Sequence, residues 1–219
     1  MRDRFDLLVF DWDGTLFDSI GWIVESIQQA AQDCDLEKPT DQAARSVIGL
    51  SLNHAMCSLY PGLGADQTSR LAEAYRAYYH REDGQPPGLF AGIPPMLDEL
   101  RAKGYRLAVA TGKLRAGLDH ALRETALEDA FDVTRCADEA ASKPDPLMLH
   151  QIMSELGVRS ERTVLIGDSV HDMRMANNAG VVAIAVGCGA NSLSELEAFN
   201  PLFSMNATAD LLTLLDSDR

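Results

Sequence analysis

The chain has 219 residues, of which 46% are hydrophobic, and a formal net charge of −14 at pH 7. This length is enough to bury a substantial core and fits one domain plus an insertion. The acidic charge disfavours nucleic acids and anionic membranes as partners, because both select for basic patches. It does not exclude anionic ligands, because a bound cation or a single basic side chain can reverse the field locally.

The composition also predicts a cytoplasmic location. The sequence has no apolar run long enough to span a membrane, and its first apolar run is too short for the core of a signal peptide. The four cysteines are scattered, without the paired spacing of a metal site or a disulfide framework. We therefore expect reduced thiols in Cys34, Cys57, Cys136 and Cys188.

The first predicted element is a buried parallel strand over residues 7–10, which ends at two closely spaced carboxylates. Ligands bind at this end of the strands in an open α/β sheet. Asp11 is the candidate nucleophile, and Asp13, turned by Gly14, is the candidate general acid and base. The alternative is a turn in which both aspartates accept hydrogen bonds from nearby amides.

Residues 18–81 are predicted to form a helical insertion, because they contain few β-branched runs. Apolar spacing and turn residues place helices within residues 20–27, 40–47, 51–60 and 66–79. Arg45 could bind a substrate carboxylate through both guanidinium branches, or it could be a solvated helix residue.

A second apolar strand over residues 107–110 ends at Thr111, Gly112 and Lys113. The Thr111 hydroxyl and the neighbouring backbone amides suit a phosphoryl oxygen, although Thr111 could equally be a helix N-cap. Lys113 could assist phosphate binding or could simply begin the next helix. Further along, Lys143 lies in a proline-rich loop, where its ammonium would offset the charge of a phosphate and a nucleophile; the alternative is a surface lysine.

A third strand over residues 163–166 is followed by Asp168 and Asp172. Mg²⁺ prefers oxygen ligands and usually keeps several waters, so one or two protein carboxylates and a substrate phosphate suffice. Asp168 is the candidate direct ligand, and Asp172 could act through water. The alternative is that both aspartates cap the next helix.

The second half of the chain alternates between predicted helices and strands. Helices are expected over 93–103, 115–126, 146–156, 172–179 and 209–215, with further strands near 131–133 and over 181–186. This alternation predicts a doubly wound parallel sheet of the Rossmann-like α/β class.

Together and in this order, the four motifs resemble the haloacid dehalogenase superfamily of phosphohydrolases, and most closely its phosphoglycolate phosphatase-like branch. The resemblance covers the whole chain. It implies a catalytic core over residues 1–17 and 82–219, with an α-helical cap over residues 18–81.

The resemblance also implies roles for the motif residues. Asp11 would be the nucleophile and Asp13 the general acid and base, while Thr111, Gly112 and Lys143 would bind the phosphoryl group. Mg²⁺ would be held by the Asp11 carboxylate, the Asp13 backbone carbonyl and the acidic loop of Asp168 and Asp172.

The predicted activity is Mg²⁺-dependent hydrolysis of a small phosphomonoester, such as 2-phosphoglycolate, through an aspartyl-phosphate. A phosphosugar mutase and a pyrophosphatase are alternatives; mutases of this kind commonly have an arginine where Leu52 lies here. A non-catalytic protein that binds phosphate esters is a further alternative. The oligomeric state is not predicted.

Overall fold

The computed structural model describes residues 4–81 and 86–217. Residues 82–85, where the expected return from the insertion to the core falls, lie outside the described residues. None of the described helices is long and apolar enough to cross a membrane.

Six parallel strands form one sheet in the order β3-β2-β1-β4-β5-β6. Strand β1 (Leu7–Phe10) lies between β2 (Arg106–Ala110) and β4 (Thr163–Gly167), and all four of its residues are buried. The outer strands are β3 (Val133–Arg135), β5 (Val182–Val186) and β6 (Phe203–Met205). The predicted doubly wound α/β class is confirmed.

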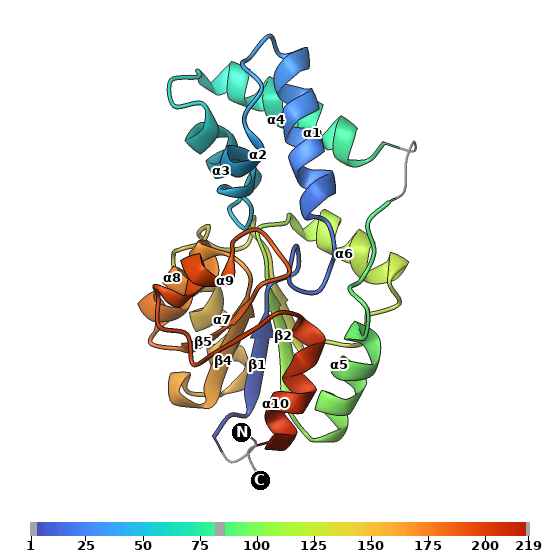
Figure 1. The fold of residues 1–219 in the computed structure, drawn as a ribbon, viewed down its shortest axis with the longest axis vertical. Coiled ribbons are helices and arrows are strands. Elements are labelled where there is room, and N and C mark those ends of the chain that lie inside the picture. Colours follow the sequence, from blue (N-terminus) through green and yellow to red (C-terminus); the bar gives the residue numbers. More distant parts are fainter. Residues whose placement is uncertain (1–3, 82–85, 218–219) are drawn as a thin grey trace.

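Helices cover both faces of the sheet, because successive strand residues point to opposite sides. Leu8 and Phe10 pack with α5 (Ile93–Ala102), α6 (Arg115–Glu124) and α10 (Leu211–Ser217). Leu7 and Val9 pack with α7 (Leu147–Leu156), α8 (Val170–Ala179) and α9 (Leu193–Glu197). Figure 1 shows β1 inside this three-layer arrangement.

Several elements differ from the predicted ones in their bounds or were not predicted. Helix α8 begins two residues early, because the Ser169 side chain and Asp172 cap its first turn reciprocally. Strand β3 begins where the predicted strand ended, and β6 and α9 were not predicted. Two 3₁₀ turns, Ser160–Arg162 and Thr208–Asp210, precede β4 and α10.

Four helices between β1 and α5 form a separate group above the carboxyl ends of the strands (Figure 1). They are α1 (Ile20–Asp33), α2 (Asp41–Arg45), α3 (Leu52–Leu59) and α4 (Ala65–Tyr79). Their apolar side chains make a cluster of their own, which Ala190 from the core also joins. We call residues 20–79 the helical lobe; the domain division at residues 18 and 81 stays a prediction.

The loop between α2 and α3 lies against the core. The Ser51 amide donates to Ser142 Oγ at 2.8 Å, and His171 Nε2 donates to the Ser46 carbonyl at 2.9 Å. Gly112 makes the contact close, since a Cβ there would lie 2.5 Å from the Leu50 carbonyl oxygen. A side chain at position 112 would therefore push this loop away.

We predict that Gly112→Ala loosens the lobe from the core, because the new methyl group cannot share space with backbone atoms of the loop. Hydrogen exchange of the amides of residues 49–51 should accelerate at least about tenfold. Gly117→Ala is the matched control, because a Cβ at that position meets nothing within 4 Å. Exchange at wild-type rates in Gly112→Ala would contradict the prediction.

Candidate active site

A cavity of about 260 Å³ lies between the helical lobe and the carboxyl ends of β1 and β2. Its core side is lined by Asp11, Asp13, Thr111, Gly112 and Lys113, together with the start of α6. Strand register brings these residues together, because Phe10 pairs with Val109 on one side and with Ile166 on the other. The three predicted motifs that follow β1, β2 and β4 thus meet at one edge of the sheet.

Asp11 is almost fully buried directly after β1. Its Oδ1 accepts from the Trp12 amide at 2.7 Å and forms an ion pair with Lys143 Nζ at 2.8 Å. Burial, and then the charge of Asp172, raise the pKa of Asp11 well above its ordinary value, against the opposing charge of Lys143.

Lys143 is buried between two carboxylates. Its Nζ lies 2.8 Å from Asp11 Oδ1 and 2.6 Å from Asp172 Oδ1. Burial alone would lower the pKa of Lys143, but the charges of Asp11 and Asp172 outweigh it and raise that pKa. Lys143 therefore carries a fixed positive charge beside Asp11, so the surface-lysine alternative is wrong.

Asp168 is held on both sides by the fold. Its Oδ1 accepts from Thr15 Oγ1 at 2.6 Å, and its Oδ2 accepts from the Ala190 amide at 2.7 Å. Two glycines make room for this carboxylate, since a Cβ at Gly14 or Gly189 would lie 2.3 or 2.0 Å from Oδ2. The Asp168 carboxylate is thereby locked in one position.

Asp11, Asp168 and Asp172 bring one oxygen each within 4.8 Å of the others, and all three are buried. Burial, and then the charge of Asp172, raise the pKa of Asp168 to about 7. The single positive charge of Lys143 compensates only part of the negative charge of the three carboxylates. A dication bound among them would compensate the remainder. Oxygen ligands of this kind suit Mg²⁺.

Asp172 also has a structural role, as the capping alternative expected. Its Oδ2 accepts from the Ser169 amide at 3.1 Å and from Ser169 Oγ at 2.6 Å, while its Oδ1 accepts from Lys143. Asp172 thus joins the start of α8 to Lys143. It caps the helix and belongs to the acidic cluster at the same time.

The Asp13 carboxylate is not part of the three-carboxylate cluster and has partners of its own. Gly14 has a φ of +78°, which produces the expected turn after β1. Asp13 Oδ1 accepts from Ser19 Oγ at 2.6 Å and lies 3.1 Å from Lys113 Nζ. Asp13 therefore lines the cavity beside Asp11 without being one of the clustered carboxylates.

Lys113 links the core to the lobe. Besides Asp13, its Nζ contacts the Tyr79 hydroxyl of α4 at 2.7 Å. Burial alone would lower the pKa of Lys113, but Asp13 and Tyr79 together outweigh it and raise that pKa. Thr111 is fully buried and lines the cavity, and its Oγ1 accepts from the Lys113 amide at 3.2 Å. Helix α6 begins at Arg115 with Leu114 as its N-cap, so the N-cap alternative for Thr111 and the helix-start alternative for Lys113 are wrong.

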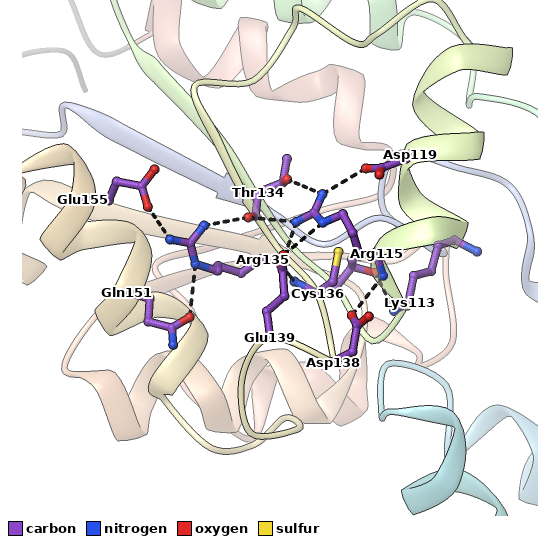
Figure 2. Close-up of polar contacts among 11 residues, drawn as sticks. Lys113, Arg115, Asp119, Thr134, Arg135, Cys136, Asp138, Glu139, Gln151 and Glu155 are labelled. Atoms are coloured by element: carbon purple, nitrogen blue, oxygen red, sulfur yellow. Dashed lines mark hydrogen bonds and ion pairs between the residues drawn. The ribbon is translucent and has the colours of Figure 1, made fainter.

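The loop after β3 is anchored to the same segment. Figure 2 shows the Arg115 guanidinium on Glu139 and Thr134, and the Arg115 amide donates to Asp138 at 2.9 Å. The Ala137 amide donates to the Lys113 carbonyl at 2.9 Å. This network ties the loop that leads to Lys143 to the residues that follow β2.

Arg45 contacts the core segment after β5, and its contact with a substrate carboxylate stays a prediction. Its Nη1 donates to the Gly189 carbonyl at 3.3 Å, and Arg45 is not among the residues that line the cavity. Among the described residues, Arg76 of α4 and His80 directly after α4 are basic groups that line the cavity, together with Tyr75 and Tyr79. Tyr75 and Tyr79 are four residues apart, as are Arg76 and His80. This i, i+4 spacing is the sequence signal that places each pair on one face of a helix.

Comparisons with known proteins agree with this geometry. The model of the family "Haloacid dehalogenase-like hydrolase" matches residues 8–186. "Probable phosphatase IndB" of Dickeya dadantii is 37% identical over 201 residues, which cover 89% of this chain and 86% of that protein.

Two further relatives cover more of this chain. "Pyrophosphatase PpaX" of Bacillus velezensis is 27% identical over 95% of both chains. A crystal structure of a haloacid dehalogenase-like hydrolase from Bacteroides fragilis has a TM-score of 0.87 and 26% identity, and the match covers 95% of this chain and all of that one. The chain belongs to the haloacid dehalogenase-like hydrolase family.

Proposed function

We propose that this protein is a Mg²⁺-dependent phosphomonoester hydrolase that works through an aspartyl-phosphate. The observation that carries the proposal is the position of Asp11, which lies on the cavity wall with Lys143 Nζ 2.8 Å from its Oδ1 and two further buried carboxylates beside it. A carboxylate at the mouth of a cation site can attack phosphorus in line, which replaces one difficult displacement by two easier ones.

Two residues perform the covalent and proton-transfer steps. An Asp11 oxygen bonds to phosphorus while the ester P–O bond breaks, and Asp13 gives its proton to the departing alkoxide. Asp13 then takes a proton from the water that attacks the aspartyl-phosphate, and the Asp11–phosphorus linkage breaks to release inorganic phosphate. Both carboxylates line the same cavity, which supports this division of roles.

The other motif residues hold the phosphoryl group. Lys143 offsets the charge of Asp11 and of the phosphoryl oxygens, and Thr111 and Gly112 line the cavity after β2. Mg²⁺, held by Asp11, Asp168, Asp172 and the Asp13 backbone carbonyl, would neutralise charge that develops on the transferred group.

We further propose that residues 18–81 act as a cap that closes over the substrate. The contacts of Ser51 with Ser142 and of Tyr79 with Lys113 support a closed position in which bulk water is excluded. All four cysteines are free, which supports the expected cytoplasmic location.

The departing group is the open part of the proposal. The family resemblance favours 2-phosphoglycolate, and the relative PpaX favours pyrophosphate. A carboxylate contact from Arg45 stays a prediction, because in this structure its guanidinium contacts Gly189. Leu52 lines the cavity where a mutase commonly has an arginine, which weakens the mutase alternative.

We predict that Asp11→Asn lowers kcat at least about 10³-fold, because the amide cannot form the acyl-phosphate. The measurement is Mg²⁺-dependent release of phosphate from a panel of phosphomonoesters. Asp18→Asn is the matched control, since Asp18 is exposed and lies in the same segment. An Asp11→Asn enzyme with more than about a tenth of wild-type kcat would overturn the role of Asp11 as nucleophile.

We also predict that millimolar Mg²⁺ raises the unfolding temperature, because it relieves repulsion among three buried carboxylates and binds only the folded state. Asp168→Asn should lose more than half of this rise, whereas Asp98→Asn, an exposed change on α5, should keep it. Differential scanning calorimetry at constant ionic strength makes the comparison. Equal stabilisation of both variants would place the metal elsewhere.

A further inference from the structure

We propose that the alcohol released by this enzyme has a hydrocarbon-rich body, alkyl or aryl, and is not glycolate, a sugar or a second phosphate. The inference rests on the proposed phosphomonoester hydrolysis and adds the chemical class of the substrate. It follows from the walls of the cavity beyond the phosphoryl-binding end.

The helical lobe presents mainly carbon atoms to the cavity. Helices α1 and α3 and the loop before α3 contribute aliphatic side chains, with Tyr75 of α4 beside them. Most of these side chains are buried in the folded protein, so the wall that they form is already in place before a substrate binds. The wall includes Ile23, Ile27, Val47, Ile48, Leu52 and Met56.

The polar side chains of Asp11, Asp13, Thr111 and Lys113, on the core side of the cavity, already have partners. Lys113 is paired with Asp13 and contacts the Tyr79 hydroxyl. Thr111 Oγ1 accepts from the Lys113 amide, and Asp11 is paired with Lys143. Among the described lining residues, this leaves Arg76 and His80 as the basic groups that could meet a second anionic group of a substrate.

Arg76 and His80 are poorly placed to hold a small, doubly anionic substrate inside the cavity. Both are exposed residues at the end of α4. The His80 ring packs edge-on against Tyr79, with ring centroids 5.3 Å apart, and burial lowers its pKa, which favours the neutral ring at pH 7. A short carboxylate such as that of glycolate would instead face aliphatic carbon.

The free-energy balance therefore selects against polar leaving groups. A carboxylate, a second phosphate or a set of sugar hydroxyls loses its water against this wall without gaining new partners. Each methylene group buried there favours binding. The same wall also keeps water away from the ester when the lobe is closed.

A series of primary alkyl phosphates from ethyl to hexyl tests the proposal. The leaving alcohols have similar intrinsic reactivity, so differences in kcat/KM report contacts with the chain. We expect kcat/KM to rise about threefold to fourfold per methylene until the wall is filled, which corresponds to about 0.8 kcal/mol per CH₂. Hexyl phosphate should also exceed 2-phosphoglycolate, glucose 6-phosphate and pyrophosphate.

Leu52→Arg is the informative variant, because Leu52 lines the cavity and is partly exposed, so the charge can be accommodated. We expect the ratio of kcat/KM for hexyl phosphate to that for 2-phosphoglycolate to fall at least about tenfold. Ser58→Arg adds the same charge to an exposed position of α3 outside the lining and should keep the ratio. Leu52→Met keeps an apolar wall and should keep the rise with chain length.

The outcomes separate this inference from the proposed function. Hydrolysis that does not depend on chain length, or that favours 2-phosphoglycolate and declines for it in Arg76→Gln, overturns the inference and leaves the phosphatase intact. If no ester is hydrolysed, calorimetric binding of the same alkyl phosphates to the wild-type protein with Mg²⁺ decides. Affinity that rises with chain length then supports the apolar site without turnover, and affinity that stays flat overturns it.

Discussion

The buried ion pairs of Lys143 are the interaction on which the rest of the site depends. A single ammonium lies 2.8 Å from Asp11 and 2.6 Å from Asp172, and all three side chains are removed from water. Removing one partner from such a group typically costs about 3–5 kcal/mol, because the remaining charges stay buried without compensation. Lys143 therefore stabilises the acidic cluster and at the same time leaves it negative enough to attract a dication.

The sheet supplies the geometry that this charge arrangement needs. Parallel register sets the ends of β1, β2 and β4 at one level, so Asp11, Thr111 and Asp168 follow neighbouring strands. The loop that carries Lys143 reaches them because Arg115 and Glu139 hold it against the segment after β2 (Figure 2). The helical lobe then covers the open side of the site, mostly with aliphatic side chains.

Much of this could be predicted from the sequence, and for a physical reason. Short apolar runs that end in polar motifs indicate buried parallel strands, and such strands bring their ends together, so the meeting of Asp11, Thr111 and Asp168 was predictable. Strand β6 and helix α9 were not predicted, because a strand of three residues and a helix of five carry too little periodicity. Their positions depend on packing against β5.

Contacts between distant segments were the least predictable part. The sequence shows Arg45 in a predicted helix, but only the fold shows that the Gly189 carbonyl lies within its reach. Lys113 and Tyr79 likewise lie far apart in the sequence, and nothing in the sequence indicates that their side chains are in contact. Arg76 carries no sequence signal of its own, because an arginine near the end of a helix is usually solvated.

The glycines beside Asp168 have a consequence for how this chain can evolve. Positions 14 and 189 lie beside the same carboxylate oxygen, and neither has room for even a methyl group. Neither residue takes part in chemistry, yet each is as restricted as the carboxylate that it surrounds. Descendants of this chain should therefore vary as little at these two glycines as at the acidic residues. A sequence motif built from the reactive side chains alone would omit the two glycines that make room for Asp168.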